Sequence, residues 1–216
     1  MPEIRDRLQS IIDELEDLLD TLESDSATLE DSGIADESAK LAIVVGHTKQ
    51  RPGASSLPPI DQSEYPWNTD LARLMLEHAA KTGLNAKTFF RDNIGVRGAY
   101  KQAKDWGASL VVELHFNSFA RPSANGTETL YGTTVAKPFA SAIQQAMLNA
   151  LGLRDRGIKD HSTGRGSSSL TALPNTPTVI IEPFFGSNPD DVATAFSRKS
   201  ELSKSLVEAA QNFLRG

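Results

Sequence analysis

The chain has 216 residues, of which 39% are hydrophobic and 23% charged, and its formal net charge at pH 7 is −6. This composition is typical of a globular protein and excludes a wholly disordered chain, a collagen-like repeat and a long uniform coiled coil. The sequence contains no Cys and four His, so disulfides and thiolate metal ligands are excluded and any metal site has few candidate imidazoles.

The charge is divided unevenly along the chain. Residues 1–40 hold 13 acidic and three basic side chains, a net charge of −10, whereas residues 41–216 hold 15 acidic and 19 basic side chains, a net charge of +4. A mildly basic body suits an anionic polymer, although an excess of this size is also ordinary for a domain of this length. No basic cluster with interleaved aromatic residues is present, so nucleic acid is not an expected partner.

Residues 1–24 predict an acidic amphipathic helix. Apolar residues recur at alternating spacings of four and three from Ile4 to Leu22, which is the spacing of a coiled coil. A helix of about three heptads is marginal alone, so its stripe must pack either on a second copy of the chain, giving a homo-oligomer, or on the body as a docking arm. Residues 25–40 are polar and rich in Ser and Asp, and they predict a linker.

Residues 41–216 predict alternating strands and helices. Apolar, β-branched runs predict strands at 41–45, 86–90, 109–116, 127–132 and 178–182. Periodic apolar residues predict helices at 66–82, 96–106, 135–151 and 192–214, the last as one helix or two, and residues 158–169 predict a flexible polar loop. This order predicts a layered α/β domain whose central sheet is mixed but mostly parallel and is flanked by helices.

Four polar side chains stand at the ends of these elements, which is where open α/β sheets bind ligands. His47 follows the first strand, His115 lies near the end of 109–116, Glu182 closes 178–182, and Glu64 precedes the helix at 66–82. Two His and one carboxylate form a known catalytic zinc set, and a carboxylate that is not a ligand can serve as general base. The residues alone leave a packed, hydrogen-bonded role open for each of them.

Around these residues the body resembles the zinc-dependent N-acetylmuramoyl-L-alanine amidases, a family that includes bacterial cell-division amidases and phage endolysins. Four segments carry the resemblance, in the family's order: VVGHTKQRPGA, the run from Glu64 through Asn68 to Ala72, LHFNS, and EPFFGSN. The resemblance covers about residues 41–215. The family's usual small residues are replaced at Thr48, Lys49 and Phe116, positions that concern the shape of the substrate groove.

The resemblance implies a phosphorylase/hydrolase-like fold and one Zn²⁺ per chain, held by His47, Glu64 and His115. It also implies that Glu182 acts as general base for a zinc-activated water. The implied reaction cleaves the amide bond between the lactyl group of N-acetylmuramic acid and L-alanine of the stem peptide, so that peptidoglycan is the expected partner.

Three further residues are candidates for substrate binding. Asn117 stands beside the third expected ligand, and His161 and Arg165 lie in the polar loop, which could overhang the groove. A solvated or purely structural role is the alternative for each. Glu113 precedes His115 by two residues and shares its face of the sheet, so a role as metal ligand and a role in hydrogen bonding behind the site are both open.

Two other functions fit the same residues. One is a catalytically silent protein that binds the cell wall or acts in an assembly, and the other is a carboxypeptidase-like zinc hydrolase. No apolar run approaches the roughly 20 residues of a membrane span, and the N-terminal MPEIRDRLQS lacks the basic and apolar regions of a secretory signal. We therefore expect synthesis in the cytoplasm and delivery to the wall by lysis, by a particle or by another route, as for a phage endolysin.

Overall fold

The computed structural model describes residues 39–216. The helix predicted for 1–24, with its possible coiled coil, and nearly all of the predicted linker lie outside the described residues. The first strand begins at Lys40, one residue before the start predicted for it.

Six strands form one mixed sheet in the order β2-β1-β3-β6-β4-β5. Their bounds are β1 Lys40–Val45, β2 Asn85–Phe90, β3 Leu110–Leu114, β4 Thr127–Tyr131, β5 Asp155–Asp160 and β6 Thr178–Glu182. Every neighbouring pair is parallel except β4 and β6, which are antiparallel. The prediction of a mixed, mostly parallel sheet is confirmed.

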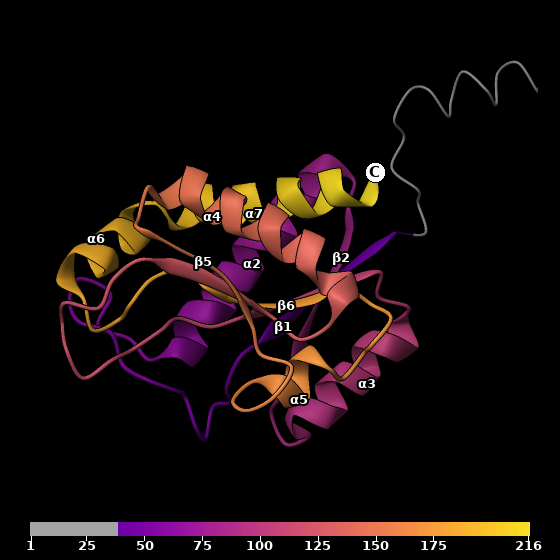
Figure 1. The fold of residues 1–216 in the computed structure, drawn as a ribbon, viewed down its shortest axis with the longest axis horizontal. Coiled ribbons are helices and arrows are strands. Elements are labelled where there is room, and N and C mark those ends of the chain that lie inside the picture. Colours follow the sequence, from indigo (N-terminus) through magenta and orange to yellow (C-terminus); the bar gives the residue numbers. More distant parts are fainter. Residues whose placement is uncertain (1–38) are drawn as a thin grey trace, which may run out of the picture. The chain divides into compact units, whose positions relative to one another are not determined.

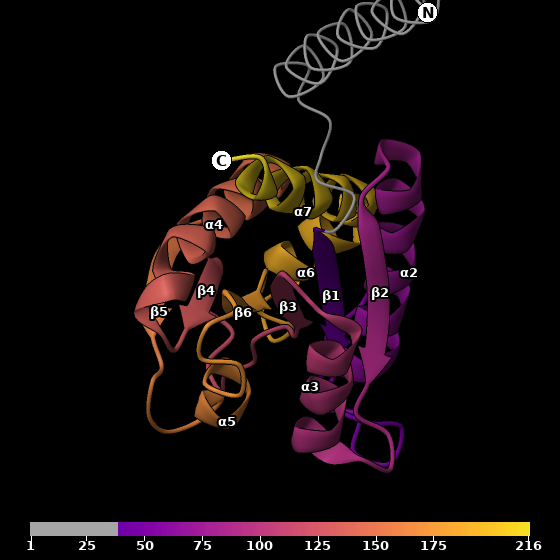
Figure 2. The same cartoon turned by 90° about the vertical axis from the view of Figure 1, so that its right-hand side faces the viewer.

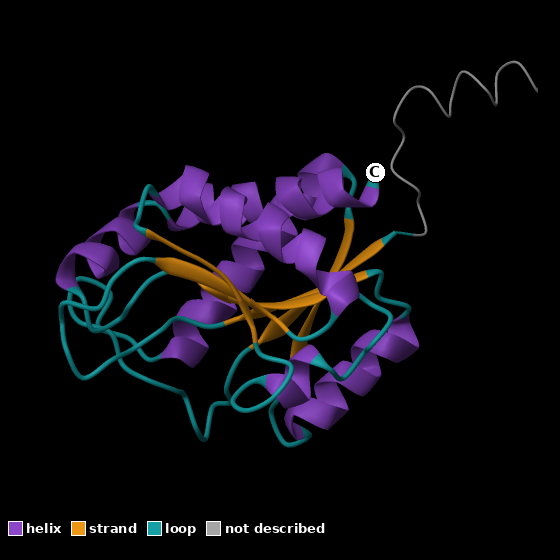
Figure 3. Ribbon diagram, viewed as in Figure 1, coloured by secondary structure: helices purple, strands orange, loops and turns teal. Residues whose placement is uncertain are grey.

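Helices cover both faces of this sheet (Figures 1 and 3). Figure 2 shows α3 and α5 on one face and the other helices on the opposite face. The bounds are α2 Glu64–Thr82, α3 Gly95–Trp106, α4 Lys137–Leu151, α5 Ser167–Leu170, α6 Pro189–Ser197 and α7 Lys199–Leu214, with a short 3₁₀ turn at Thr134–Ala136. Within the described residues, no helix is both long and apolar enough to cross a membrane.

The alternation of side chains along β1 divides the core into two parts. Leu41, Ile43 and Val45 pack with α2, α4, α6 and α7, whereas Ala42 and Val44 pack with α3. All five side chains are fully buried, because successive residues of a strand point to opposite faces and both faces are covered. A continuous apolar run is therefore what this central strand requires.

The structure differs from the sequence predictions at several element ends. β5 and α5 fall in and beside the segment 158–169, which was predicted to be a loop. The strand predicted for 109–116 ends at Leu114, so His115 follows the strand instead of lying within it. The helix predicted from residue 66 begins at Glu64, and the C-terminal helices are two, the first starting at Pro189.

Candidate metal centre

The candidate site lies at the carboxyl ends of three parallel strands. His47 follows β1 after one glycine, His115 follows β3 directly, and Glu182 is the last residue of β6. β3 pairs with β1 on one side and with β6 on the other, in parallel register, so these three strand ends meet at one edge of the sheet. His47 has a φ of +67°, a left-handed conformation that is uncommon for a residue with a side chain and is found at functional turns.

Glu64 reaches the same edge as the first residue of α2. The preceding loop sets its position, since the backbone N–H of Ala54 donates to Glu64 Oε1 at 3.0 Å. Asn68, one turn further along α2, donates from Nδ2 to the carbonyl of Leu114 at 2.9 Å. This buried hydrogen bond ties the start of α2 to the end of β3, immediately before His115, which gives Asn68 a structural reason for its place in the motif.

The two imidazoles and the Glu64 carboxylate converge on one point. Glu64 Oε2 lies 3.1 Å from His47 Nε2 and 3.0 Å from His115 Nδ1. The three candidate ligand atoms lie within 4.8 Å of one another, and no other group of three or more metal-ligating side chains does so in the described part of the chain. In tetrahedral zinc sites, bond lengths of about 2.0–2.1 Å place ligand atoms about 3.3 Å apart. The donor set therefore has the spacing and chemistry of a zinc site.

An unpartnered atom supports this assignment. His47 Nε2 is buried and makes no hydrogen bond, although Glu64 Oε2 is close to it. A buried polar atom without a partner is costly, and a divalent cation between the three side chains would satisfy it. The residues present thus fit a metal ion.

The two carboxylates of the site differ in their acidity. Burial raises the pKa of Glu64, but the adjacent imidazoles of His115 and His47 outweigh burial and bring its pKa down to about 2. Burial also raises the pKa of Glu182, and the negative charges of Glu64 and Glu128 act in the same direction against the charge of His115, so that its pKa rises to about 8. Glu182 Oε2 is buried without a hydrogen-bond partner. Glu64 is therefore suited to ligation and Glu182 to proton transfer.

One cavity of about 400 Å³ contains all the predicted site residues. Its lining includes the residues predicted from the sequence as ligands, base and substrate-binding groups: His47, Glu64, His115, Asn117, His161, Arg165 and Glu182. The structure thus brings together side chains that lie as far apart in the sequence as residues 47 and 182.

Sequence reasoning missed the group that holds Asn117. The Nδ2 atom of Asn117 donates to Glu128 Oε1 at 2.8 Å, and Arg156 Nε donates to Glu128 Oε2 at 2.7 Å. Glu128 lies opposite Glu182 in the antiparallel β4–β6 pair. Glu128 is the second residue of a short strand, and only this pairing, which no local pattern reveals, brings it to the site.

Two other residues singled out from the sequence have clear surroundings. His161 Nδ1 lies 3.1 Å from the backbone carbonyl of Arg165, so the two loop residues are held near each other.

Asn188, part of the fourth motif, is the N-cap of α6, where its Oδ1 accepts from the N–H groups of Asp190 and Asp191 at 3.0 Å each. Asn188 does not line the cavity, and its role in the structure is to cap the helix.

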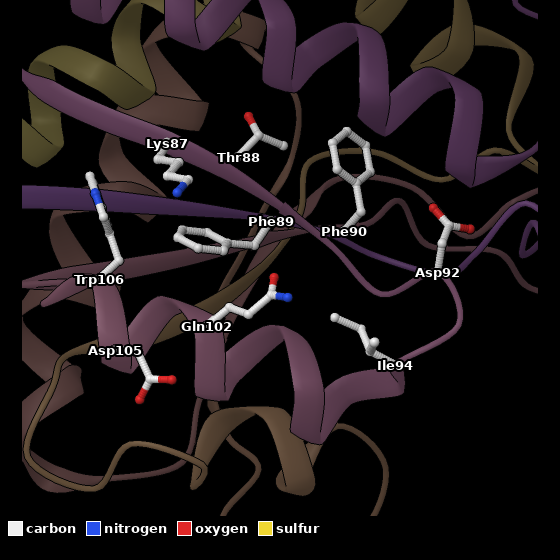
Figure 4. Close-up of a pocket in the computed structure, with 9 residues that line it drawn as sticks. All are labelled: Lys87, Thr88, Phe89, Phe90, Asp92, Ile94, Gln102, Asp105 and Trp106. Atoms are coloured by element: carbon white, nitrogen blue, oxygen red, sulfur yellow. The ribbon is translucent and has the colours of Figure 1, made fainter.

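A larger cavity of about 670 Å³ lies between β2 and α3 (Figure 4). Its lining contains no His, and the side chains of Phe89, Phe90, Ile94 and Trp106 make up much of it. Its two carboxylates have their own partners, Tyr65 for Asp92 and Lys101 for Asp105. This cavity therefore lacks the donor set found at the edge of the sheet.

Known proteins share this fold, and one family model matches most of the chain. The family model described as N-acetylmuramoyl-L-alanine amidase matches residues 41–212. The catalytic domain of CwlV, an N-acetylmuramoyl-L-alanine amidase from Bacillus (Paenibacillus) polymyxa var. colistinus, has a TM-score of 0.72 at 23% identity over 82% of this chain and 98% of that one. The catalytic domain of the CD27L endolysin has a TM-score of 0.69 at 22% identity over 81% of this chain and 97% of that one.

A curated relative matches over a shorter stretch. The N-acetylmuramoyl-L-alanine amidase LytC of Bacillus subtilis (strain 168) is 32% identical over 90 residues, which are 40% of this chain and 17% of the relative. The match thus spans less than a fifth of that protein's length. The family model, in contrast, extends from β1 to within α7 and includes all the motifs of the site. The chain belongs to the N-acetylmuramoyl-L-alanine amidase family.

Proposed function

We propose that this chain is a zinc-dependent hydrolase that acts on the bacterial cell wall, cleaving the amide bond between the lactyl group of N-acetylmuramic acid and L-alanine of the stem peptide. The observation that carries the proposal is the meeting of His47, Glu64, His115 and Glu182 in one cavity. Membership of the amidase family supports the choice of bond and substrate.

His47, Glu64 and His115 would hold one Zn²⁺ through Nε2, Oε2 and Nδ1, the atoms that face one another. When bound, zinc supplies Lewis acidity, which stabilises negative charge on the carbonyl oxygen and favours the ionisation of water. The three side chains fix the position of that acidity at the wall of the cavity, beside the place where the scissile amide must lie.

Glu182 is the general base in this proposal. Its carboxylate takes a proton from the attacking water and then gives it to the nitrogen of the departing L-alanine. Burial raises the pKa of this carboxyl above its ordinary value, and a group whose pKa is moved toward the working pH can accept and release a proton readily. Glu182 must stay free of the metal for this role, and it is not among the three side chains whose ligand atoms meet.

Asn117, His161 and Arg165 are proposed to contact the substrate. Arg165 and His161 belong to the segment between β5 and α5 and line the cavity, and a guanidinium group binds carboxylates well through paired hydrogen bonds. Stem peptides carry carboxylates, so Arg165 is the residue we assign to the peptide side. Asn117 lines the cavity and is already held by Glu128, which keeps its carboxamide in one orientation.

The proposal is tested by digesting purified peptidoglycan with the zinc-loaded protein and identifying the products by mass spectrometry. We expect intact stem peptides with a free amino group on L-alanine, and glycan chains whose lactyl groups end in a free carboxylate. Trimmed stem peptides would identify a peptidase of related fold instead. If the protein contains one zinc per chain but leaves the peptidoglycan unchanged, it binds the wall without cleaving it.

A further inference from the structure

A buried ionic cluster lies behind the candidate metal ligands. Glu113, in β3, is 1% exposed, and a buried carboxylate is tolerated only when it is paired and hydrogen-bonded. Arg91 Nη1 donates to its Oε1 at 2.7 Å and Tyr100 Oη donates to its Oε2 at 2.7 Å. The third partner is His115, whose Nε2 lies 2.9 Å from Glu113 Oε1.

Three separate elements build this cluster. Glu113 points to the face of the sheet that α3 covers, where Tyr100 belongs to the same apolar cluster as Val111. Arg91 follows β2 directly, and β2 is separated from β3 by β1 alone. The cluster is therefore assembled across the sheet and is not a local contact on one strand.

The two ring nitrogens of His115 face two different carboxylates. Nδ1 lies 3.0 Å from Glu64 Oε2, on the side of the candidate metal position, and Nε2 faces Glu113 on the other side. Both oxygens of Glu113 accept hydrogen bonds, and Glu113 is not among the three side chains whose candidate ligand atoms meet. These contacts favour the role in hydrogen bonding behind the site.

We propose that Glu113, paired through Oε1 with Arg91, is a positioning residue that keeps the proton of His115 on Nε2 and so presents Nδ1 to the metal. A ligating His commonly donates its second N–H to a carboxylate, which fixes the tautomer and the ring orientation. The inference rests on the proposed function, because it concerns how the chain prepares its site for zinc.

Zinc affinity measured by competition with a chromophoric chelator tests the inference. Glu113→Gln keeps the shape of the side chain and removes its charge, and we expect zinc affinity to fall about 10- to 100-fold with one zinc still bound at saturation. The matched control is Tyr100→Phe, which removes the hydrogen bond to Oε2 and leaves the contact of Oε1 with His115. We expect the control to change zinc affinity less than about threefold, whatever it does to stability.

Two results in these variants would overturn the inference. The first is an unchanged zinc affinity in Glu113→Gln. The second is an equal fall in both variants, which would show that the cluster only supports the fold. Urea unfolding of each variant reports the stability separately, so a loss of stability is not mistaken for a loss of positioning.

A measurement on the unaltered protein decides the matter if Glu113→Gln does not fold. In zinc-loaded protein with ¹⁵N-labelled His, long-range proton–nitrogen NMR spectra should show His115 with a protonated Nε2 and a metal-bound Nδ1. The reverse assignment would overturn the inference while leaving the proposed function intact. Failure of the unaltered protein to take up any zinc would instead overturn the proposed function, and this inference with it.

Discussion

Glu64 and Glu182 carry the same side chain in one cavity but have opposite environments. Glu64 lies between two imidazoles and its pKa falls to about 2, whereas at Glu182 burial outweighs the charge of His115 and the pKa rises to about 8. Carboxylates whose environments push their pKa values apart take different chemical roles. The division between ligand and base is therefore visible in the surroundings of each residue.

Replacing Glu182 by Gln should separate these roles. We expect Glu182→Gln to bind one zinc per chain as before, because the three ligands are unchanged, and to lose about 10²- to 10⁴-fold in kcat, because the proton acceptor is gone. Metal analysis and a peptidoglycan digest measure the two quantities. Loss of zinc from this variant would place Glu182 among the ligands.

Replacing Gly46 by Ala should displace His115, because the added methyl group would clash with it. A Cβ there would lie 2.3 Å from the carbonyl oxygen of Leu114 and 2.5 Å from His115 Nε2. We expect Gly46→Ala to lower the free energy of unfolding by about 1–3 kcal/mol and to weaken zinc binding. Urea unfolding and chelator competition check both effects.

Gly83 provides the matched control for Gly46. A Cβ at Gly83 meets no atom within 4 Å, although φ is +74°, so Gly83→Ala should cost about 1 kcal/mol through backbone strain alone. Its zinc affinity should equal that of the unaltered protein. Equal zinc affinity in the Gly46 and Gly83 variants would contradict the steric argument.

Among the elements, α6 depends on its first residue. Asn188 caps the helix and also donates from Nδ2 to the carbonyl of Pro122 at 2.7 Å. We expect Asn188→Ala to lower the free energy of unfolding by about 1 kcal/mol or more, measured by urea unfolding. Asn188→Ser keeps a capping oxygen without placing a negative charge against the Pro122 carbonyl and should retain most of the stability, so a loss as large as in Asn188→Ala would assign the effect to the Pro122 contact.

The elements also show what a sequence can reveal and what it cannot. β1, β3 and β6 were predicted because strands covered on both faces need continuous apolar runs. β5 was missed because DRGIKD is polar, contains a glycine and forms a strand only by pairing with β4 at the edge of the sheet. α5, with four residues, is too short for any helical period to appear.

The same reasoning applies to the site. His47, Glu64, His115 and Glu182 were predictable because they stand at element ends and carry motifs of a known family. The ion pair of Glu113 with Arg91 was not predictable. It depends on the strand order, in which β1 lies between β3, which contains Glu113, and β2, which Arg91 follows. Contacts made across a sheet depend on strand order, which no segment of the sequence encodes locally.

For the molecule as a whole, the site makes stability depend on pH when metal is absent. Burial lowers the pKa of His115, but Glu113 and Glu64 outweigh burial and raise it from 6.5 to about 10. Between these values the folded protein binds a proton that the unfolded chain has released, so the free energy of unfolding falls as pH rises. The contribution of His115 is complete below pH 6.5 and is lost as pH approaches 10. Glu182, with a pKa raised from 4.5 to about 8, adds to this fall up to pH 8.

We therefore expect the metal-free protein to unfold at lower urea concentration at pH 9 than at pH 6, with a slope of up to about 1.4 kcal/mol per pH unit for each proton involved. Chelator-treated protein measured at several pH values checks this. Saturating zinc should flatten the dependence of stability on pH, because the metal takes the place of the proton on Nδ1 of His115. A metal-free protein that is more stable at pH 9 would contradict the assignment.

The order of the strands along the chain determines when, during synthesis, each proposed site residue becomes available. The first two proposed ligands precede residue 65, the third is His115, and the proposed base closes β6, which takes its place beside β3 only after β4 and β5 have been made. A nascent chain on the ribosome therefore holds every metal donor long before it holds its base. Fragments that end before β6 contain the proposed ligands but lack the proposed base.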